Sequence, residues 1–241
     1  MDYQKKNILV TGAYQGIGKS ICEYFGKAKA NLIITYHEHQ EETIKLKEEL
    51  ESKYQINVFV YYLDLSNEES IKNLYNKVKE KYQKLDVLIN NAAISLDSFI
   101  LDKTKKEFMK VLEINVVGTF LMMKYFDSIM DKGYIFNISS TDGIDTGNVY
   151  SIDYNASKAS INSMTLTFSL YSHNTIISLC PNWVDTESTR CMDNNYLENE
   201  LKRVHQKELI NPIEVPKTID RCIKNNIKTG SIIRIEGEGN E

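Results

Sequence analysis

The chain has 241 residues, of which 42% are hydrophobic and 26% charged, and this composition suits a globular protein with a sizeable buried core. A formal net charge of -4 argues against a nucleic-acid partner or an anionic membrane surface, since either would favour a basic face. No apolar run is long enough to span a membrane, and residues 1–10 lack the apolar region of a signal peptide. We therefore expect a cytoplasmic protein with neither a nucleic-acid nor a membrane partner.

The cysteines, histidines and prolines argue against several other architectures. Four cysteines are spread along the chain without a Cys-x-x-Cys pair, which predicts reduced thiols rather than disulfides or a zinc site. His37 and His39 are the only close histidine pair and no further ligands accompany them, so we expect no metal site. All three prolines lie beyond residue 180, and without a proline-rich linker residues 1–241 are expected to form a single domain.

The N-terminal segment predicts a strand, a glycine-rich loop and a helix. Residues 6–12 form an aliphatic run that ends in glycine, which is typical of a buried strand entering a turn, and an amphipathic helix follows. Gly12 would allow the sharp turn, Gly16 the approach of a phosphate and Gly18 close packing of the helix on the strand. Three glycines alone could be a plain tight turn, but their place between strand and helix favours a pyrophosphate site at the helix N-terminus.

Further strands alternate with helices along the first half of the chain. Residues 31–36, 57–62 and 86–90 are β-branched and aliphatic runs, and charged helical segments follow the first two. Ser66, with Glu69 at the capping-box spacing, is the expected N-cap of the second of these helices. This alternation predicts a parallel sheet with helices on both faces.

A helix is predicted from residue 104 to about residue 130, and Asn115 lies in its middle. Asn115 is followed by two β-branched residues and Gly118, which is poor helix chemistry. Two explanations stay open for this position. It could be a packing kink, or a locally opened helix could free a backbone carbonyl to hold a catalytic water.

Residues 134–158 combine a buried strand with three side chains suited to acid–base chemistry. Ser140 follows the apolar run 134–138, at the strand end where open α/β sheets place their ligands. Tyr154 and Lys158 are four residues apart, so a helix would project both from one face. An ammonium fixed beside the phenol would lower the tyrosine pKa toward neutrality, as a general acid or base requires.

The C-terminal third of the chain predicts two more strands, at residues 175–180 and 231–235. Between them, residues 187–211 are polar and irregular, with one helix expected near residues 196–206. We expect residues 183–211 to form a loop or lid over a substrate site.

Taken in this order, the motifs resemble those of the short-chain dehydrogenase/reductase family, in its short, single-domain branch. The matching stretches run nearly from end to end: Thr11–Gly18, Asp64, Asn90–Ala93, Asn115, Ser140, Tyr154-x-x-x-Lys158 and Pro181–Thr186. The resemblance implies an α/β fold, a Rossmann-type doubly wound parallel sheet of about seven strands with helices on both faces. It also implies an oxidoreductase that uses a nicotinamide dinucleotide to interconvert a ketone and a secondary alcohol.

The same resemblance implies four catalytic residues. Tyr154 would be the general acid or base, and Ser140 would hydrogen-bond and orient the substrate carbonyl. Lys158 would bind the ribose hydroxyls and lower the tyrosine pKa, while Asn115 would anchor a water that relays protons to solvent. These roles combine general-acid catalysis with hydrogen bonds placed at a developing oxyanion.

Further residues are implied as contacts of the dinucleotide. Asp64 and Leu65 would meet the adenine, whereas Val184 and Thr186 would bind the carboxamide. The whole implied set is Gly12, Tyr14, Gln15, Gly16, Ile17, Gly18, Tyr36, His37, Asp64, Leu65, Asn91, Ala92, Ala93, Tyr154, Lys158, Pro181, Val184 and Thr186. Asn182 stands where the family usually has glycine, and asparagine tolerates the positive φ that glycine would supply there.

The end of the second strand indicates which dinucleotide is bound. A carboxylate there would bind the ribose hydroxyls of NAD and repel a 2′-phosphate, but this chain has Tyr36 and His37. That favours NADP(H) over NAD(H). The arginine or lysine that often meets the phosphate is missing, however, and Glu38 lies close by in the sequence.

The stretch 90–99 resembles that of 3-oxoacyl-acyl-carrier-protein reductases, so a 3-oxoacyl thioester is one candidate substrate and another small carbonyl compound is the alternative. Leu96 stands where those reductases have a basic residue, which weakens the case for docking an acidic carrier protein. The substrate pocket is expected between residues 95–98, 142–150 and 183–205, with a partly apolar wall from Tyr150, Trp183, Met192 and Tyr196.

Two rival functions follow from the same residues. A dinucleotide-binding regulator or scaffold without turnover would have no physical need for the complete tetrad. A nucleotide-sugar dehydratase or epimerase would favour a longer chain with a separate substrate domain. By resemblance to the family we expect a homodimer or homotetramer, and Met122, Met123 and Phe126 could contribute to its interface or could face the core.

Overall fold

The computed structural model describes residues 2–82 and 84–236 of the chain. Within these residues the strands form a single sheet in the order β3-β2-β1-β4-β5-β6-β7, and each neighbouring pair is parallel. Strand order reverses between β1 and β4, which is the switch point where such sheets bind ligands. The strands are β1 (Asn7–Val10), β2 (Asn31–Tyr36), β3 (Val58–Tyr62), β4 (Val87–Asn90), β5 (Tyr134–Ile138), β6 (Thr175–Pro181) and β7 (Ile232–Ile235).

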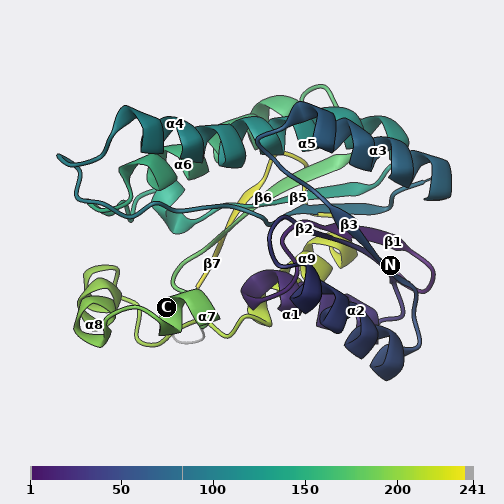
Figure 1. Cartoon of the computed structure of the whole chain (residues 1–241), viewed down its shortest axis with the longest axis horizontal. Coiled ribbons are helices and arrows are strands. Elements are labelled where there is room, and N and C mark those ends of the chain that lie inside the picture. The colour runs from purple at the N-terminus through teal and green to yellow at the C-terminus, as the bar shows by residue number, and fades with distance from the viewer. Residues whose placement is uncertain (1, 83, 237–241) are drawn as a thin grey trace.

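Helices cover both faces of the sheet and give the molecule three layers (Figure 1). The upper layer in that view contains α3 (Glu68–Tyr82), α4 (Lys105–Leu112), α5 (Thr119–Phe126) and α6 (Ile152–Phe168). The lower layer contains α1 (Gly16–Lys27), α2 (Gln40–Tyr54) and α9 (Glu214–Lys224). The predicted Rossmann-type, doubly wound α/β fold is therefore confirmed. None of the helices in the described ranges is both long and apolar enough to cross a membrane.

Alternate strand residues enter two separate hydrophobic cores, one on each face of the sheet. In β1, Ile8 and Val10 join the core that holds Phe25 of α1, whereas Leu9 joins the core that holds Phe126 of α5. The strands are apolar on both faces because helices cover both. Met122, Met123 and Phe126 are fully buried, so the core-facing role is the one observed for these three residues.

The long helix predicted for residues 104–130 is interrupted at its centre. A π-helical segment, Glu113–Gly118, separates α4 from α5, and a 3₁₀ turn ends the run at Ile129. Asn115 lies inside the π-helix, so the sequence correctly marked the irregular position. Single π-turns within α-helices occur frequently at functional sites.

Two local expectations need correction. Ser66 does not cap α3: its hydroxyl donates to Asp64 Oδ1, while Asn67 Oδ1 accepts the amides of Glu69 and Ser70. Asn67 can take this role because its short carboxamide accepts from the first turn as a serine would. Asn182 does not have positive φ, so the left-handed turn considered there does not form.

The segment after β6 folds into two short helices rather than the one expected near residues 196–206. These are α7 (Glu187–Arg190) and α8 (Asn194–Arg203), and Asp193 accepts the Tyr196 amide at the start of α8. A β-bridge between Val184 and Ile210 joins the two ends of the segment. The segment thus leaves the sheet and returns to it with its two ends held together, and Figure 1 shows its helices at the edge of the molecule.

Candidate active site

A cavity of about 580 Å³ opens at the carboxyl ends of the central strands. Every residue of the set implied for the dinucleotide lines this cavity, together with Ser140. Asn115 is the exception among the candidate residues, because it is fully buried behind the wall. Segments that are far apart in the sequence are thus brought to one site, as expected at the switch point of a parallel sheet.

The glycine-rich loop fits the predicted phosphate cradle. Gly12 and Gly16 have φ of +64° and +53°, a conformation that side chains disfavour. A Cβ on Gly18 would lie 2.3 Å from the Gly12 carbonyl oxygen, so only glycine allows this approach of helix and loop. Glycine at these positions keeps side chains away from the start of α1, where the helix dipole favours an anion.

Residues after β4 hold the glycine loop in place. Asn91 Nδ2 donates to the carbonyl oxygens of Thr11 and Gly12, each at 2.9 Å. Thr11 Oγ1 in turn accepts the amides of Asn91 and Ala92 at 3.0 Å. Asn91 was predicted to contact the dinucleotide, but its amide group is used to shape the loop.

Asn115 joins three segments that surround the site. Its Oδ1 accepts the Ile94 amide at 2.9 Å, while its Nδ2 donates to the Ile94 carbonyl at 2.8 Å and to Ser157 Oγ at 3.1 Å. These contacts use both N–H donors of the carboxamide and leave one lone pair on Oδ1. The backbone carbonyls of the π-helix are the other acceptors that could hold a water at this position.

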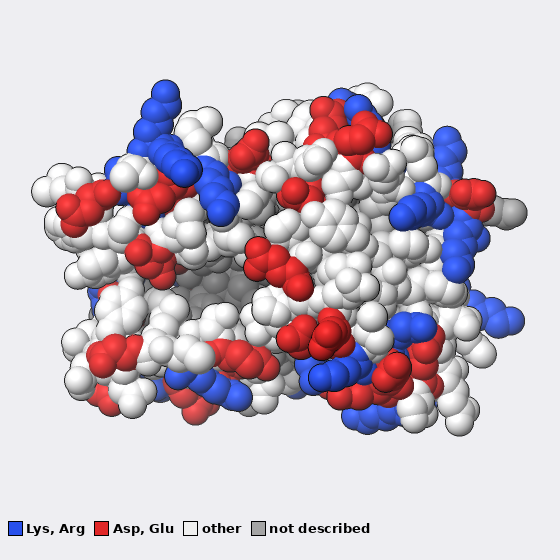
Figure 2. All heavy atoms as spheres, viewed as in Figure 1, with Lys and Arg blue, Asp and Glu red and all other residues white. Residues whose placement is uncertain are grey.

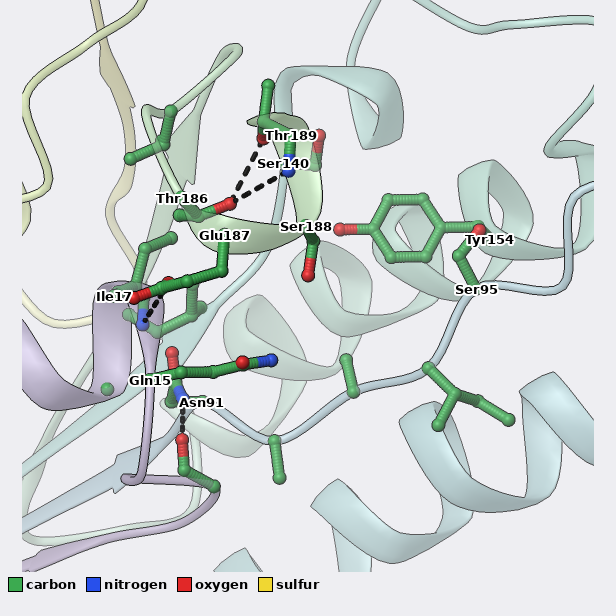
Figure 3. A pocket seen from close by; sticks show the side chains of 18 of the residues that line it. Gln15, Ile17, Asn91, Ser95, Ser140, Tyr154, Thr186, Glu187, Ser188 and Thr189 are labelled. Carbon is green, nitrogen blue, oxygen red and sulfur yellow. Dashed lines mark hydrogen bonds between the residues drawn. The ribbon is translucent and has the colours of Figure 1, made fainter. Parts of the chain in front are cut away.

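Ser140, Tyr154 and Lys158 meet at one side of the cavity. Ser140 Oγ accepts the Asp142 amide at 3.1 Å, in the 3₁₀ turn that follows β5. Lys158 Nζ donates to the Ile138 carbonyl at 2.8 Å and lies 5.1 Å from the centre of the Tyr154 ring. Figure 3 shows the Tyr154 hydroxyl pointing into the pocket. The helical spacing of Tyr154 and Lys158 therefore does place them side by side on α6.

The protein environment shifts both groups away from the charged state. Burial raises the pKa of the Tyr154 hydroxyl above its ordinary value, and the carboxylates of Asp142 and Asp97 raise it further. Burial also lowers the pKa of Lys158 to about 8, against the opposing effects of Cys180 and Asp142. The expectation that Lys158 alone brings the tyrosine pKa toward neutrality is thus wrong, because loss of hydration outweighs the nearby ammonium.

The end of the cavity beside β2 carries both imidazole and carboxylate groups. His37 lies between two acids, with Nε2 3.9 Å from Asp64 Oδ2 and Nδ1 3.7 Å from Glu38 Oε1. The ring of His39 stacks on that of Tyr14 at a centroid distance of 4.2 Å. Among the described residues that line the cavity, Lys158 is the only lysine or arginine.

Several lining residues were not named individually but lie in the segments where the substrate pocket was expected. Asp97, Asp142 and Glu187 bring carboxylates into the wall, and Ser95 and Ser188 bring hydroxyls. Of the four pocket residues expected near the substrate, Trp183, Met192 and Tyr196 line the cavity, whereas Tyr150 stays outside its lining. Asp97, Asp142 and Glu187 lie in the expected segments 95–98, 142–150 and 183–205, but no role was predicted for their carboxylates.

Comparison with known proteins identifies the family. The sequence profile of the short chain dehydrogenases matches residues 6–196, most of the chain. The protein is a short-chain dehydrogenase. As a member of this family it is an NAD(P)-dependent oxidoreductase, and the nicotinamide dinucleotide and the enzyme class implied by its motifs are confirmed.

Two relatives of this short-chain dehydrogenase carry the name 3-oxoacyl-acyl-carrier-protein reductase FabG. That of Aquifex aeolicus is 29% identical over 242 residues and covers 97% of each chain. That of Thermotoga maritima is 30% identical over 247 residues, with 98% of each chain covered. The sequence resemblance to this kind of reductase is therefore confirmed.

The fold is shared with solved structures of lower identity. A short chain dehydrogenase from Burkholderia cenocepacia, solved in complex with NADP, superposes with a TM-score of 0.90 at 21% identity, and the match covers all of both chains. At 21% identity this similarity shows that the two proteins share a fold.

Proposed function

We propose that this short-chain dehydrogenase reduces a ketone to a secondary alcohol in the cavity at the end of the sheet. The observation that carries the proposal is that Ser140, Tyr154 and Lys158 line the same cavity as the glycine-rich loop. When bound, the reduced nicotinamide supplies a hydride to the carbonyl carbon. The residues of the chain supply the proton and the hydrogen bonds that the developing alkoxide needs.

Tyr154 is the proposed general acid, and Ser140 the group that orients the carbonyl. The raised pKa of Tyr154 keeps the phenol protonated at neutral pH until a neighbouring oxygen gains negative charge. Ser140 Oγ accepts the Asp142 amide, and its hydroxyl lies beside the Asp142 carboxylate. On substrate binding the hydroxyl hydrogen would turn from that carboxylate to the same carbonyl oxygen. The two donors would together stabilise the alkoxide as it forms.

Lys158 is proposed to stabilise the tyrosinate that proton transfer leaves behind and to bind the ribose hydroxyls. Only one of its three donors is used in the bond to the Ile138 carbonyl, which leaves two for the dinucleotide. With a pKa of about 8 the amine is mostly protonated at neutral pH. For Asn115 we propose an indirect part in the proton relay, in which the π-helical backbone that it fixes holds the water.

The remaining lining residues are proposed to hold the dinucleotide as the family resemblance implies. The loop of residues 11–18 would cradle the pyrophosphate, and Asp64 and Leu65 would meet the adenine. Val184 and Thr186 line the opposite end, where they would bind the carboxamide. The whole segment 183–211 would then act as the substrate loop of a single domain.

We propose NADP(H) as the preferred cofactor because no carboxylate stands at the end of β2, where Tyr36 is found. A 2′-phosphate would instead meet His37 and His39, which can donate hydrogen bonds and become cationic. Glu38 and Asp64 lie beside His37 and would hold its imidazole toward the ribose. The Burkholderia dehydrogenase that was solved with NADP has the same fold, which is compatible with this choice.

A 3-oxoacyl thioester is the substrate that the names of the FabG relatives suggest. Its carbonyl would bind at the Tyr154 end of the cavity. The test is nicotinamide absorbance with a short 3-oxoacyl thioester and either NADPH or NADH. Faster turnover with NADPH would support both assignments, and faster turnover with NADH would overturn the cofactor preference. Binding of both cofactors without turnover of any carbonyl compound would favour the non-catalytic regulator instead.

A homodimer or homotetramer is also proposed for this enzyme. Met109, Val117 and Phe120 are large apolar residues that remain exposed on the α4–α5 side of the molecule. They could form an interface without disturbing the core, unlike the buried methionines of α5. Sedimentation velocity with Phe120→Glu would test this, since the proposal predicts a smaller species than in the wild-type protein.

A further inference from the structure

A carboxylate from a distant part of the chain binds the glycine-rich loop where the loop enters α1. Glu187 Oε2 accepts the backbone amide of Gly16 at 3.0 Å, across 171 residues of sequence. Figure 3 shows this bond between the first residue of α7 and the loop that opens α1. A carboxylate at such an amide is the arrangement that a phosphate oxygen adopts at a helix N-terminus.

The N-terminus of α1 has no other internal anion. Gln15 stands at the N-cap without a side-chain cap, and the first turn contains no acidic residue. Glu187 is itself exposed, and within the described ranges no lysine or arginine forms a salt bridge with it. In the described residues the Glu187 carboxylate accepts a hydrogen bond from the Gly16 amide alone, while the Glu187 backbone carbonyl accepts the Cys191 amide.

The contact also presses the segment after β6 against the glycine loop. A Cβ built on Gly16 would lie 3.2 Å from Thr186 Cγ2 and 3.7 Å from Glu187 Oε2. The segment is tied at its base by the Val184–Ile210 bridge and by Gln206, which bonds both the amide and the carbonyl of Trp183. α8 is also held by the loop before α6, because Asn148 Nδ2 donates to the Tyr196 hydroxyl at 2.7 Å and to Glu200 Oε2 at 2.9 Å. The part that can move away from Gly16 as a flap without breaking the sheet is therefore α7.

We propose that Glu187 is an internal competitor of the dinucleotide's pyrophosphate, and that pyrophosphate binding releases the α7 flap from the glycine loop. The proposal rests on the proposed function, since it takes the glycine loop as the pyrophosphate site. The carboxylate and the pyrophosphate would need the same amide, and their like charges would repel at short range. Cofactor binding would thereby come first and free the flap to receive the carbonyl substrate.

Acidic surroundings add to this competition. Figure 2 shows that this face of the molecule is hollowed, with Asp and Glu side chains along the rim of the hollow. Asp64, Asp97, Asp142 and Glu187 line the cavity, against Lys158 as the single lysine among the described lining residues. Of these carboxylates, only Glu187 is bonded to the loop that would hold the pyrophosphate.

The first test measures the binding of ADP and of adenosine by titration calorimetry. ADP contains the pyrophosphate, adenosine lacks it, and neither has a nicotinamide that could draw the flap closed. Glu187→Gln should tighten ADP binding about two- to fivefold, the usual size of a carboxylate effect at a helix N-terminus, and leave adenosine unchanged. Glu198→Gln, which removes a charge from exposed α8, is the matched control and should leave both ligands unchanged.

Glu187→Asp separates the contact from the charge, because it keeps the carboxylate and shortens its reach by one methylene. The proposal predicts that this variant also binds ADP more tightly than wild type. A wild-type affinity for Glu187→Asp, with tightening only in Glu187→Gln, would show a charge effect and overturn the competition for Gly16. Unchanged or weaker ADP binding by Glu187→Gln would overturn it as well.

The second test follows the flap itself by hydrogen exchange. ADP should speed amide exchange across residues 187–193 of the wild-type protein. Glu187→Ala, which removes the acceptor of the Gly16 amide, should exchange fast there without ADP. Slower or unchanged exchange on adding ADP to the wild type would overturn the release. If neither ADP nor NADPH binds at all, the proposed function fails along with this inference, whereas normal turnover with an unresponsive flap refutes only the inference.

Discussion

Asp142 sets part of the chemistry of Tyr154 through its charge, while its backbone amide donates to Ser140 Oγ. It lines the cavity and raises the tyrosine pKa, second only to burial among the causes. In the oxidation direction the base must be the tyrosinate, so a lower pKa would make that form available at lower pH. Asp142→Asn keeps the acceptor for Thr146 Oγ1 while removing the charge.

We therefore predict that Asp142→Asn moves the rising limb of the pH–rate profile to lower pH, by about half a unit to one unit. The profile is measured for oxidation of a 3-hydroxyacyl thioester. Asp102→Asn removes a charge from an exposed position outside the cavity and should leave the limb in place. A shift to higher pH would contradict the electrostatic role given to Asp142.

At Lys158 the proposed function opposes the stability of the fold. Its pKa falls from 10.5 to about 8 on folding because the ammonium loses its hydration. Below pH 8 the unfolded and native forms are both charged, and the native form bears the cost of burial. Between pH 8 and 10.5 the unfolded chain binds more protons than the native one, so this group's destabilising effect fades as pH rises.

We predict that Lys158→Met abolishes turnover and raises the free energy of unfolding at pH 7 by about 1–3 kcal/mol, after allowing for the lost bond to Ile138. The advantage over wild type should shrink between pH 8 and 10.5. Urea denaturation at pH 7 and pH 10 measures both effects. A variant less stable than wild type at pH 7 would show that the bond to Ile138 outweighs the cost of burial.

At the scale of elements, the π-helix connects packing to the site. Asn115 is fixed to both backbone groups of Ile94 and to Ser157 of α6, so its loss would leave buried partners without a bond. Asn115→Ala should lower the free energy of unfolding by about 1–3 kcal/mol, measured in urea. Asn76→Ala on the exposed side of α3 serves as control and should change it by less than about 0.5 kcal/mol.

Two glycines of α1 separate a ligand effect from a general helix effect. A Cβ on Gly18 would collide with the Gly12 carbonyl at 2.3 Å, whereas a Cβ on Gly26 would meet the side chain of Tyr54 at 2.9 Å. A ring can move more readily than the backbone of the loop. Gly18→Ala should therefore weaken ADP binding at least about tenfold, and Gly26→Ala should leave it near wild type. Equal affinities in calorimetry would argue against a rigid cradle.

The elements were predictable from the sequence where their signal is local. Aliphatic runs ending in glycine or polar residues located the strands, and the poor helix chemistry after Asn115 located the π-helix. The cap of α3 was misassigned because Ser66 and Asn67 are both good caps, and only the bond of Ser66 to Asp64 distinguishes them. In the polar segment after β6, the helix expected near residues 196–206 corresponds to α8, whereas the four residues of α7 are too few to show a helical period.

At the scale of the whole molecule, the cavity brings together residues whose relation the sequence could only suggest through a family resemblance. The contact of Gly16 with Glu187 spans 171 residues, and no local pattern predicts a pairing of that kind. The pKa of Tyr154 was predicted with the wrong sign because burial, the largest cause, depends on how all layers pack around α6. The sequence shows that Lys158 is a helical neighbour of Tyr154, but it does not show how far burial removes water from the Tyr154 hydroxyl.

The most direct test of the central claim is NADPH oxidation by Tyr154→Phe with a short 3-oxoacyl thioester, read beside NADPH binding. If Tyr154 is the general acid, the variant should bind NADPH within about threefold of wild type and lose at least about 100-fold in kcat. Tyr171→Phe, at an exposed position beyond α6, should behave as wild type. A Tyr154→Phe variant that turns over at the wild-type rate would contradict the account.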